Sequence, residues 1–289
     1  MQPQFREYLR EGERAGLRYR LTVPRDAPLG ALGTETGHRA GASLDFKDYR
    51  EYQPGDDLRH IDWQIYGRTD RLTVKLFREE VFPHVDLVLD GSCSMVLEDT
   101  AKARATLGLA ALLAAAAGNA HCTHRAWLAG AGLLPLPGSG SSPAAWDGLA
   151  FAHAGSPAAA LRTPPAWRPR GVRVLISDLL WLEEPLAVLR PLAHGAAALL
   201  VLQVLAAVEA DPAFLGNTRL VDVESGEVLE VFVDAVTQAR YRQALATQQQ
   251  NWHRACRQVG AYFATVIAEP LVQTWAVTPL QVAQILEPA

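Results

Sequence analysis

Residues 82–95 constrain the fold of this chain more than any other segment. They contain a largely apolar run, Val85–Leu89, whose length and composition are typical of a fully buried parallel strand. The run stops at Asp90, and hydroxyl side chains follow at alternate positions, Ser92 and Ser94. The segment therefore predicts a buried strand with polar groups gathered at its carboxyl end.

The acid at the end of this strand needs compensation. A carboxylate in that position is costly unless a cation or several hydrogen-bond donors lie beside it. Hard divalent ions prefer carboxylate and hydroxyl oxygens, which are the groups that Asp90, Ser92 and Ser94 provide. The pattern Asp-x-Ser-x-Ser after an apolar strand resembles the metal-ion-dependent adhesion site of von Willebrand factor type A domains.

A second apolar strand also ends in an acid. Residues 172–178 read Val-Arg-Val-Leu-Ile-Ser-Asp, so that Asp178 closes the run. In a doubly wound sheet, ligands bind outside the carboxyl ends of the strands, at the point where the strand order reverses. We therefore predict that strands 85–90 and 172–178 are neighbours. The alternative for Asp178 is a structural role, in which it caps the turn that follows.

The adhesion-site resemblance implies a complete ligand set. Its pattern has a threonine in a loop before a helix, and Ser156 stands at the matching position. The resemblance implies that Ser92, Ser94 and Ser156 bind the ion directly, while Asp90 and Asp178 hold ion-bound waters. The implied ion is Mg²⁺, with Mn²⁺ or Ca²⁺ as alternatives, and an Asp or Glu of a partner protein would complete its coordination. Whether the ion binds before the partner stays open, and Ser156 can equally be a helix N-cap.

A different motif precedes these strands. Pro54-Gly55-Asp56 predicts a turn, because proline presets one dihedral angle and glycine permits the next. We expect Tyr52, Ile61 and Trp63 to form an apolar cluster under the turn, with ion pairs around it. The motif consists of Arg50, Tyr52, Pro54, Gly55, Asp56, Asp57, Arg59, Asp62 and Trp63. A structural clamp is favoured over catalysis here.

Together with the Asp-x-Ser-x-Ser pattern, this motif resembles the bacterial domain of unknown function 58 family, over roughly residues 37–265. The resemblance implies a von Willebrand A-like domain over residues 81–289, preceded by an N-terminal arm and β-rich extension over residues 1–80. It assigns no catalytic activity. It also implies a MoxR-type AAA+ ATPase as partner, in the assembly or maturation of a protein complex.

Composition and charge narrow the class of protein. The net charge of −4 gives no support to nucleic-acid binding. The odd number of cysteines, three, argues against a disulfide framework and fits a reducing compartment. The first 20 residues lack the apolar core of a secretion signal, and no apolar run is long enough to span a bilayer. We therefore expect a cytoplasmic protein with no membrane span.

The remaining segments alternate between strand and helix patterns. Strands are expected over 125–129, 197–205 and 262–267, a hairpin over 219–233, and helices over 1–16, 100–117, 143–152, 184–194, 234–259 and 278–286. This alternation predicts an α/β fold, a doubly wound and mostly parallel sheet with helices on both faces, of von Willebrand A or Rossmann-like type.

Two other functions stay open. A metal-dependent phosphohydrolase of the haloacid dehalogenase type needs a second acid two residues after Asp90, where this chain has Ser92. No phosphate-binding Gly-rich loop and no nucleophile elbow are present either. The other alternative is a metal-free interaction module, in which Asp90 and Asp178 only cap loops.

Overall fold

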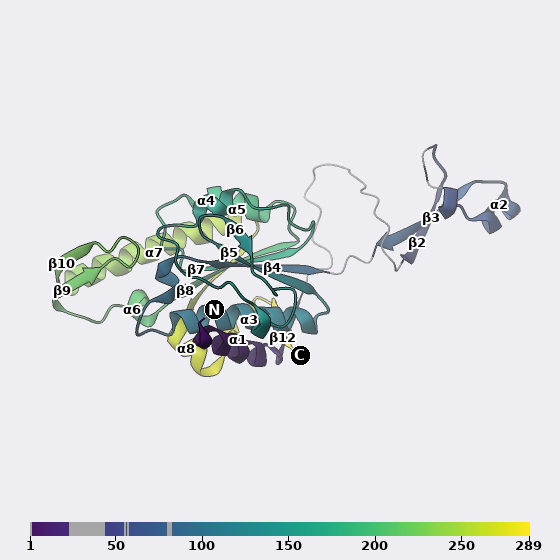
Figure 1. The fold of residues 1–289 in the computed structure, drawn as a ribbon. Coiled ribbons are helices and arrows are strands. Elements are labelled where there is room, and N and C mark those ends of the chain that lie inside the picture. The colour runs from purple at the N-terminus through teal and green to yellow at the C-terminus, as the bar shows by residue number, and fades with distance from the viewer. Residues whose placement is uncertain (1, 23–43, 55, 57, 80–82) are drawn as a thin grey trace. The chain divides into compact units, whose positions relative to one another are not determined.

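The computed structural model describes residues 2–22, 44–54, 56, 58–79 and 83–289 (Figure 1). The chain divides into two compact units. One unit is Pro28–Phe82, and the other joins Met1–Ala27 to Pro83–Ala289. The predicted extension over residues 1–80 differs from this division, because residues 1–27 belong to the larger unit.

The larger unit is built on a six-stranded sheet with the order β11-β8-β7-β4-β5-β6. All neighbouring strands are parallel except the short β6, which pairs antiparallel with β5. The strands are β4 His84–Asp90, β5 Thr123–Ala129, β6 Leu133–Pro135, β7 Val172–Ser177, β8 Ala198–Leu205 and β11 Tyr262–Ile267. The expected mixed α/β fold with a mostly parallel sheet is confirmed.

Helices cover both faces of this sheet (Figure 1). One face carries α1 Pro3–Gly16, α3 Lys102–Asn119 and α8 Ala268–Thr274, and the other carries α4 Ala158–Arg162, α5 Pro185–Ala193 and α7 Ala235–Gln258. Strand β4 shows why two layers are needed. Its side chains alternate between the faces, so that Leu87 and Leu89 join one buried cluster and Val88 joins the other.

Smaller elements complete this unit. They are β1 Tyr19–Leu21, α6 Ala207–Ala210, β9 Gly216–Val221, β10 Val228–Val233, α9 Thr278–Val282 and β12 Leu286–Pro288. The expected hairpin is present as β9 and β10. One predicted helix was wrong, and another was predicted too long. Residues 143–152 form only the 3-10 turn Pro143–Ala145, and Gly148, with a φ of 72°, cannot continue a helix. The C-terminal helix stops at Val282, because residues 286–288 pair with β1.

Helices α1 and α3 approach each other through two glycines. A Cβ atom built on Gly12 would lie 2.0 Å from the carbonyl oxygen of Gly108. A Cβ atom on Gly108 would in turn lie 1.9 Å from the ring of Trp275. The backbone of α1 can therefore pack this closely against α3 because Gly12 has no side chain, and the missing side chain of Gly108 makes room for the ring of Trp275.

Replacing Gly12 with alanine is expected to destabilise the protein by about 1–3 kcal/mol, because the new methyl group forces α1 away from α3. Urea denaturation of the purified variant measures this loss. Gly118→Ala is the matched control. A Cβ atom there meets no atom within 4 Å, so that variant should be stabilised by about 0.5–1 kcal/mol through helix propensity. Equal effects of the two substitutions would contradict the close packing.

The smaller unit contains β2 Leu44–Glu51 and β3 Thr73–Glu79, paired antiparallel, a 3-10 turn Leu58–His60 and α2 Trp63–Thr69. Arg50 forms a bidentate ion pair with Asp56, at 2.7 and 3.0 Å. Asp62 caps α2 through the backbone N–H groups of residues 64 and 65 and pairs with Lys75 at 3.0 Å. Of the predicted motif residues, Gly55 and Asp57 lie outside the described residues.

The predicted apolar cluster under the turn was partly wrong. Ile61 is buried, but Trp63 is 62% exposed and stacks edge-on against Tyr66 on the surface of α2. Trp63 is the first residue of a helix that Asp62 caps, and this start directs the indole outward. Ion pairs do form around the turn, although with other partners than the expected set of Arg50, Arg59, Asp57 and Asp62, since Arg50 pairs with Asp56 and Asp62 with Lys75.

Candidate functional site

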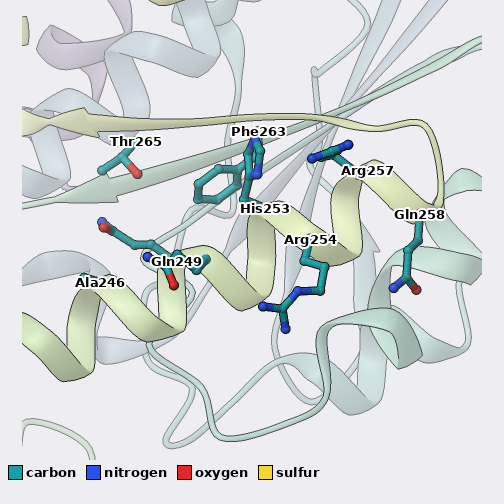
Figure 2. A pocket seen from close by; sticks show the side chains of 9 residues that line it. Ala246, Gln249, His253, Arg254, Arg257, Gln258, Phe263 and Thr265 are labelled. Atoms are coloured by element: carbon teal, nitrogen blue, oxygen red, sulfur yellow. The ribbon is translucent and has the colours of Figure 1, made fainter.

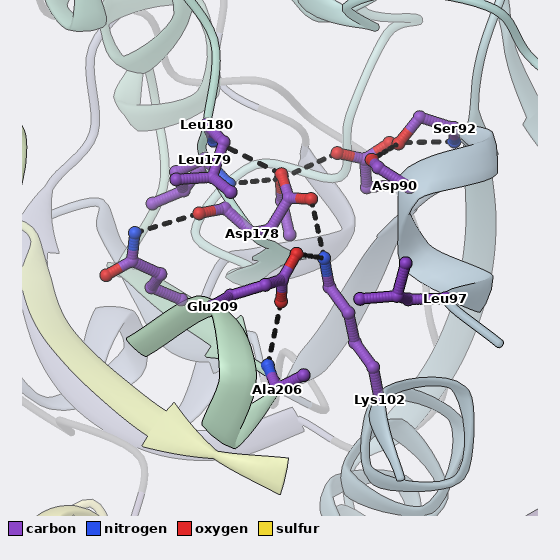
Figure 3. A network of polar contacts seen from close by, with 12 residues as sticks. Asp90, Ser92, Leu97, Lys102, Asp178, Leu179, Leu180, Ala206 and Glu209 are labelled. Atoms are coloured by element: carbon purple, nitrogen blue, oxygen red, sulfur yellow. Dashed lines mark hydrogen bonds and ion pairs between the residues drawn. The ribbon is translucent and has the colours of Figure 1, made fainter. Parts of the chain in front are cut away.

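The strand order reverses at β4. The chain continues from β4 to β5 on one side of the sheet, whereas β7 and β8 lie on the other side. Strands β4 and β7 are direct neighbours, with Leu89 opposite Ile176. Asp90 ends β4, and Asp178 follows the last residue of β7. The prediction that the acid-tipped strands lie side by side is therefore confirmed (Figure 3).

Asp90 is fully buried and is held by hydrogen bonds. The Ser92 backbone N–H donates to Oδ1 at 2.9 Å, and the Ser177 hydroxyl donates to Oδ2 at 2.6 Å. Burial, and then the negative charge of the nearby Asp178, raise the pKa of Asp90 to about 6. No ion pair joins this carboxylate to a cationic side chain among the residues that the structure describes.

Asp178 is buried as well, but it has a cationic partner. The Lys102 ammonium donates to its Oδ2 at 2.8 Å, and the Leu180 backbone N–H donates to its Oδ1 at 3.1 Å. The second contact is the turn cap that the residues suggested as a structural role for Asp178. The Gln203 side chain, from β8, donates to the backbone carbonyl of Asp178 at 2.8 Å. Asp178 is thereby held by Lys102 of α3, by Gln203 of β8 and by the turn that follows it.

Lys102 lies at the start of α3 and is completely buried. Its Nζ also donates to Oε1 of Glu209 at 2.7 Å, and the other oxygen of Glu209 accepts from the Ala206 backbone N–H at 2.8 Å. Burial alone would lower the pKa of Lys102, but the carboxylates of Asp178 and Glu209 outweigh it, and the pKa lies above its ordinary value. Lys102 therefore carries its charge at neutral pH.

The charges at this edge of the sheet do not cancel. Three carboxylates, those of Asp90, Asp178 and Glu209, lie at this edge, and within the described part of the chain the ammonium of Lys102 contacts two of them, Asp178 and Glu209. With every group ionised, the cluster carries a net charge of −2, from three negative charges and one positive charge. Such a cluster attracts a cation or keeps a proton on one of its acids.

The serine hydroxyls lie beside this cluster. The hydroxyls of Ser92 and Ser94 are 2.9 Å apart; Ser92 is buried and Ser94 is half-buried. The segment that leads to Ser156 runs along the same turn, because the Cys93 backbone N–H donates to the carbonyl of His153 at 3.0 Å. The Ser156 hydroxyl accepts from the backbone N–H of Ala158, the first residue of α4, at 3.1 Å, although the N-cap position of this helix is Pro157 and not Ser156.

The two acids and the hydroxyls of Ser92 and Ser94 therefore gather at one edge of the sheet, whereas Ser156 stays a predicted member that is linked to this edge through the backbone pairing of His153 with Ser92 and Cys93. Among the residues that the structure describes, no group of three or more His, Cys, Asp or Glu side chains is arranged to hold a metal ion. The predicted set does not depend on such a group, because three of its five members are serines. Its donors are all oxygens, which suit Mg²⁺, Mn²⁺ or Ca²⁺.

Sequence reasoning missed Lys102, Glu209 and Ser177. Lys102 stands at the start of an alanine- and leucine-rich helix that is otherwise almost wholly apolar on its buried side, and this isolation was the available signal. Ser177 precedes Asp178 directly and was read only as part of the strand. Glu209 has no local signal, because it lies on the short α6, after β8.

Comparison with known proteins places the chain in a family. The family model "Protein of unknown function DUF58" matches residues 48–251, well over half of the chain. The chain belongs to the DUF58 family. DUF58 relatives include the uncharacterized protein Rv1480 of Mycobacterium tuberculosis and the uncharacterized protein Mb1516 of Mycobacterium bovis. Each is 29% identical over 263 residues, which cover 83% of this chain and 80% of the relative.

Solved structures resemble this DUF58 chain only distantly. The conserved hypothetical protein BatB from Bacteroides thetaiotaomicron gives a TM-score of 0.32 at 12% identity, over 70% of this chain and 98% of that one. An aerotolerance-related membrane protein from Bacteroides fragilis gives 0.27 at 12% identity, over 66% and 95%. Within the described residues of this chain, no helix has the length and apolar character needed to span a membrane.

Proposed function

We propose that this DUF58 protein is a non-enzymatic protein-interaction adaptor of the von Willebrand A type. Its contact face would be the carboxyl edge of β4 and β7. The observation that carries the proposal is the neighbouring pair Asp90 and Asp178 at the strand-order reversal, where ligands of α/β sheets bind. The hydroxyls of Ser92 and Ser94, next to this pair, supply neutral oxygens.

We further propose that partner binding depends on a divalent cation. The excess negative charge of the cluster and the raised pKa of Asp90 both favour an added cation. The hydroxyls of Ser92, Ser94 and Ser156 would bind the cation directly. Asp90 and Asp178 would hold waters that are bound to the cation. A bound Mg²⁺, Mn²⁺ or Ca²⁺ would leave an open position for an Asp or Glu of the partner. Neutral ligands suit this role, because they leave the cation needing further negative charge.

A metal-free interaction module is the second candidate, and Lys102 favours it. Its ammonium already provides Asp178 with a buried positive charge. The Ser177 hydroxyl and the Ser92 backbone N–H donate to the carboxylate of Asp90, which stabilises its ionised form without a cation. In this form, the cluster stabilises the loops of the contact face, and the partner binds to their surface without an ion.

The proposed partner is a MoxR-type AAA+ ATPase or a protein on which that ATPase acts. The support is the resemblance of the motifs at Arg50–Trp63 and Asp90–Ser94 to the family. The proposed setting is the cytoplasm and the proposed process is assembly or maturation of a protein complex. A metal-dependent phosphohydrolase would instead turn over a phosphate ester such as p-nitrophenyl phosphate.

Adding 10 mM MgCl₂ (about 100 times a dissociation constant of about 0.1 mM) should stabilise the chelator-treated protein by about 2.7 kcal/mol, or about 5–10 °C in Tm. Ser94→Ala should abolish most of this shift, because it removes one proposed ligand and leaves the buried acids intact. Differential scanning fluorimetry measures both. Ser225→Ala, which removes an exposed hydroxyl in the β9–β10 turn, should keep the full shift.

Absence of a Tm shift with Mg²⁺, Mn²⁺ and Ca²⁺ would overturn the metal-dependent form and leave the metal-free module. A pull-down with a MoxR-type ATPase, with and without EDTA, then decides whether the face binds that partner at all. Binding that survives EDTA supports the metal-free module. Turnover of p-nitrophenyl phosphate that Ser94→Ala abolishes would contradict the non-enzymatic proposal.

A further inference from the structure

Strand β11 forms an edge of the sheet. It pairs with β8 on one side, and no described segment forms backbone hydrogen bonds with its other side. Its six residues, Tyr-Phe-Ala-Thr-Val-Ile, include no charge and no proline, and its pairing with β8 shows no bulge. Natural proteins usually protect exposed sheet edges with charged side chains, prolines or bulges. An edge without them is suited to accept a further strand.

An open groove runs beside this edge (Figure 2). It is lined on one side by α7 and on the other by Phe263 and Thr265 of β11. The lining residues of α7 include Gln249, His253 and Arg257, which recur every four residues and so share one face of the helix. Figure 2 shows Gln249 and His253 directed from α7 toward the strand.

The two elements beside the groove have the length of a short extended peptide. The six residues of β11 span about 17 Å from first to last, and residues 246–257 of α7 also span about 17 Å. An added strand of about six residues would therefore lie beside β11 over its whole length. Phe263, which packs edge-on against His253 with ring centroids 6.2 Å apart, offers an apolar contact within the groove.

The charge of the groove favours one kind of ligand. Its lining holds Arg254 and Arg257, together with His253 and three glutamines, and includes no Asp or Glu. Both arginines are exposed, and neither forms an ion pair with a carboxylate in the described part of the chain. The whole chain has a net charge of −4, whereas the lining of this groove is positively charged. It suits carboxylates, which guanidinium groups bind with two hydrogen bonds.

We propose that an extended, acidic segment of a partner protein binds in this groove as an added strand on β11. Its backbone would pair with the free edge of β11, and its Asp or Glu side chains would bind Arg254 and Arg257. Nucleic acid is disfavoured, because a sugar-phosphate backbone cannot continue the ladder of the sheet and the chain carries net negative charge. This inference is independent of the ion site at β4 and β7.

Selection from a displayed library of random octapeptides on the full-length protein tests the proposal. We expect the selected peptides to be enriched in Asp and Glu and depleted in proline. A synthetic peptide from the selection should bind Arg254→Glu/Arg257→Glu at least 10-fold more weakly, because the charge of the groove is reversed. Arg240→Glu, on an exposed part of the same helix outside the groove, should bind it within about 2-fold.

Alternate N-methylation of the same peptide separates strand addition from simple charge attraction. Methyl groups on one edge remove the backbone donors needed for pairing, so the peptide methylated on the pairing edge should lose at least 10-fold in affinity. Unchanged affinity of both methylated forms would overturn strand addition. Selected peptides without acidic bias, or a single-stranded oligonucleotide that displaces the peptide at lower concentration than unlabelled peptide does, would overturn the proposed partner class.

Discussion

Replacing Lys102 with methionine is expected to destabilise the folded protein by about 3–5 kcal/mol. The methionine fills a similar volume, but it leaves the carboxylates of Asp178 and Glu209 without the ammonium that both contact. Buried charges that lose their partner keep the full cost of removal from water. Urea denaturation at pH 7.5 in the presence of EDTA measures the loss.

Two controls show whether the effect comes from the buried charges. Lys102→Met combined with Asp178→Asn and Glu209→Gln should recover most of the stability, because no unpaired charge then remains. Lys75→Met removes a lysine that is 38% exposed from its ion pair with Asp62, and should cost less than about 1 kcal/mol. A small effect of Lys102→Met in EDTA would mean that the ammonium is not what compensates these acids.

Asp90→Asn is expected to be more stable than the wild type above pH 6 when divalent ions are removed. The native pKa of about 6 lies above the ordinary 3.8, so the native state binds a proton more tightly than the unfolded state does. The stability that this proton provides is complete below about pH 4 and is lost as the pH rises through 6. The difference between these two pKa values corresponds to about 3 kcal/mol of stability. The asparagine variant is neutral at every pH and therefore does not lose this stability.

Denaturation of both proteins between pH 4 and 8 measures this difference, which should vanish near pH 4. Asp222→Asn is a control without this dependence. Hydrogen bonds from the backbone N–H groups of Ser225 and Glu224 lower the pKa of Asp222 below its ordinary 3.8, so the stability that this carboxylate adds is lost only below about pH 4, and the difference between the wild type and that variant should stay constant from pH 5 to 8. If the Asp90→Asn difference is independent of pH, the carboxylate of Asp90 does not titrate near 6 in the folded protein.

The local sequence predicted the strands of the site well. Val85–Leu89 and Val172–Ile176 are each apolar enough to be recognised as buried strands, and the acids at their ends could be placed together by the rule for strand-order reversal. The cationic partner of Asp178 could not be found in this way. Lys102 is 76 residues away from Asp178 in the chain, and no local pattern specifies a contact made only by tertiary packing.

The wrong predictions for residues 286–288 and for Trp63 also arise because the local sequence does not specify tertiary contacts. Residues 286–288 form a strand because β1, at the other end of the chain, offers a pairing edge, and this long-range contact outweighs the helical pattern of the segment. Trp63 was expected in a cluster because large aromatic residues are usually buried, but the start of α2 leaves it exposed. Hydrophobicity indicates which side chains can be buried, whereas the direction of the backbone decides which of them are buried.

The shared ammonium of Lys102 also limits how this edge of the sheet can move. Asp178 follows β7 and Glu209 belongs to α6, and the Tyr241 hydroxyl of α7 donates to the backbone carbonyl of Glu209. A shift of α7 along its axis therefore has to carry α6 with it or break that hydrogen bond. If α6 follows, the distance between Glu209 and Lys102 changes, and so does the electrostatic balance at Asp178. A displacement of α7 would thus change the ion pairs of Lys102 at the carboxyl end of β7.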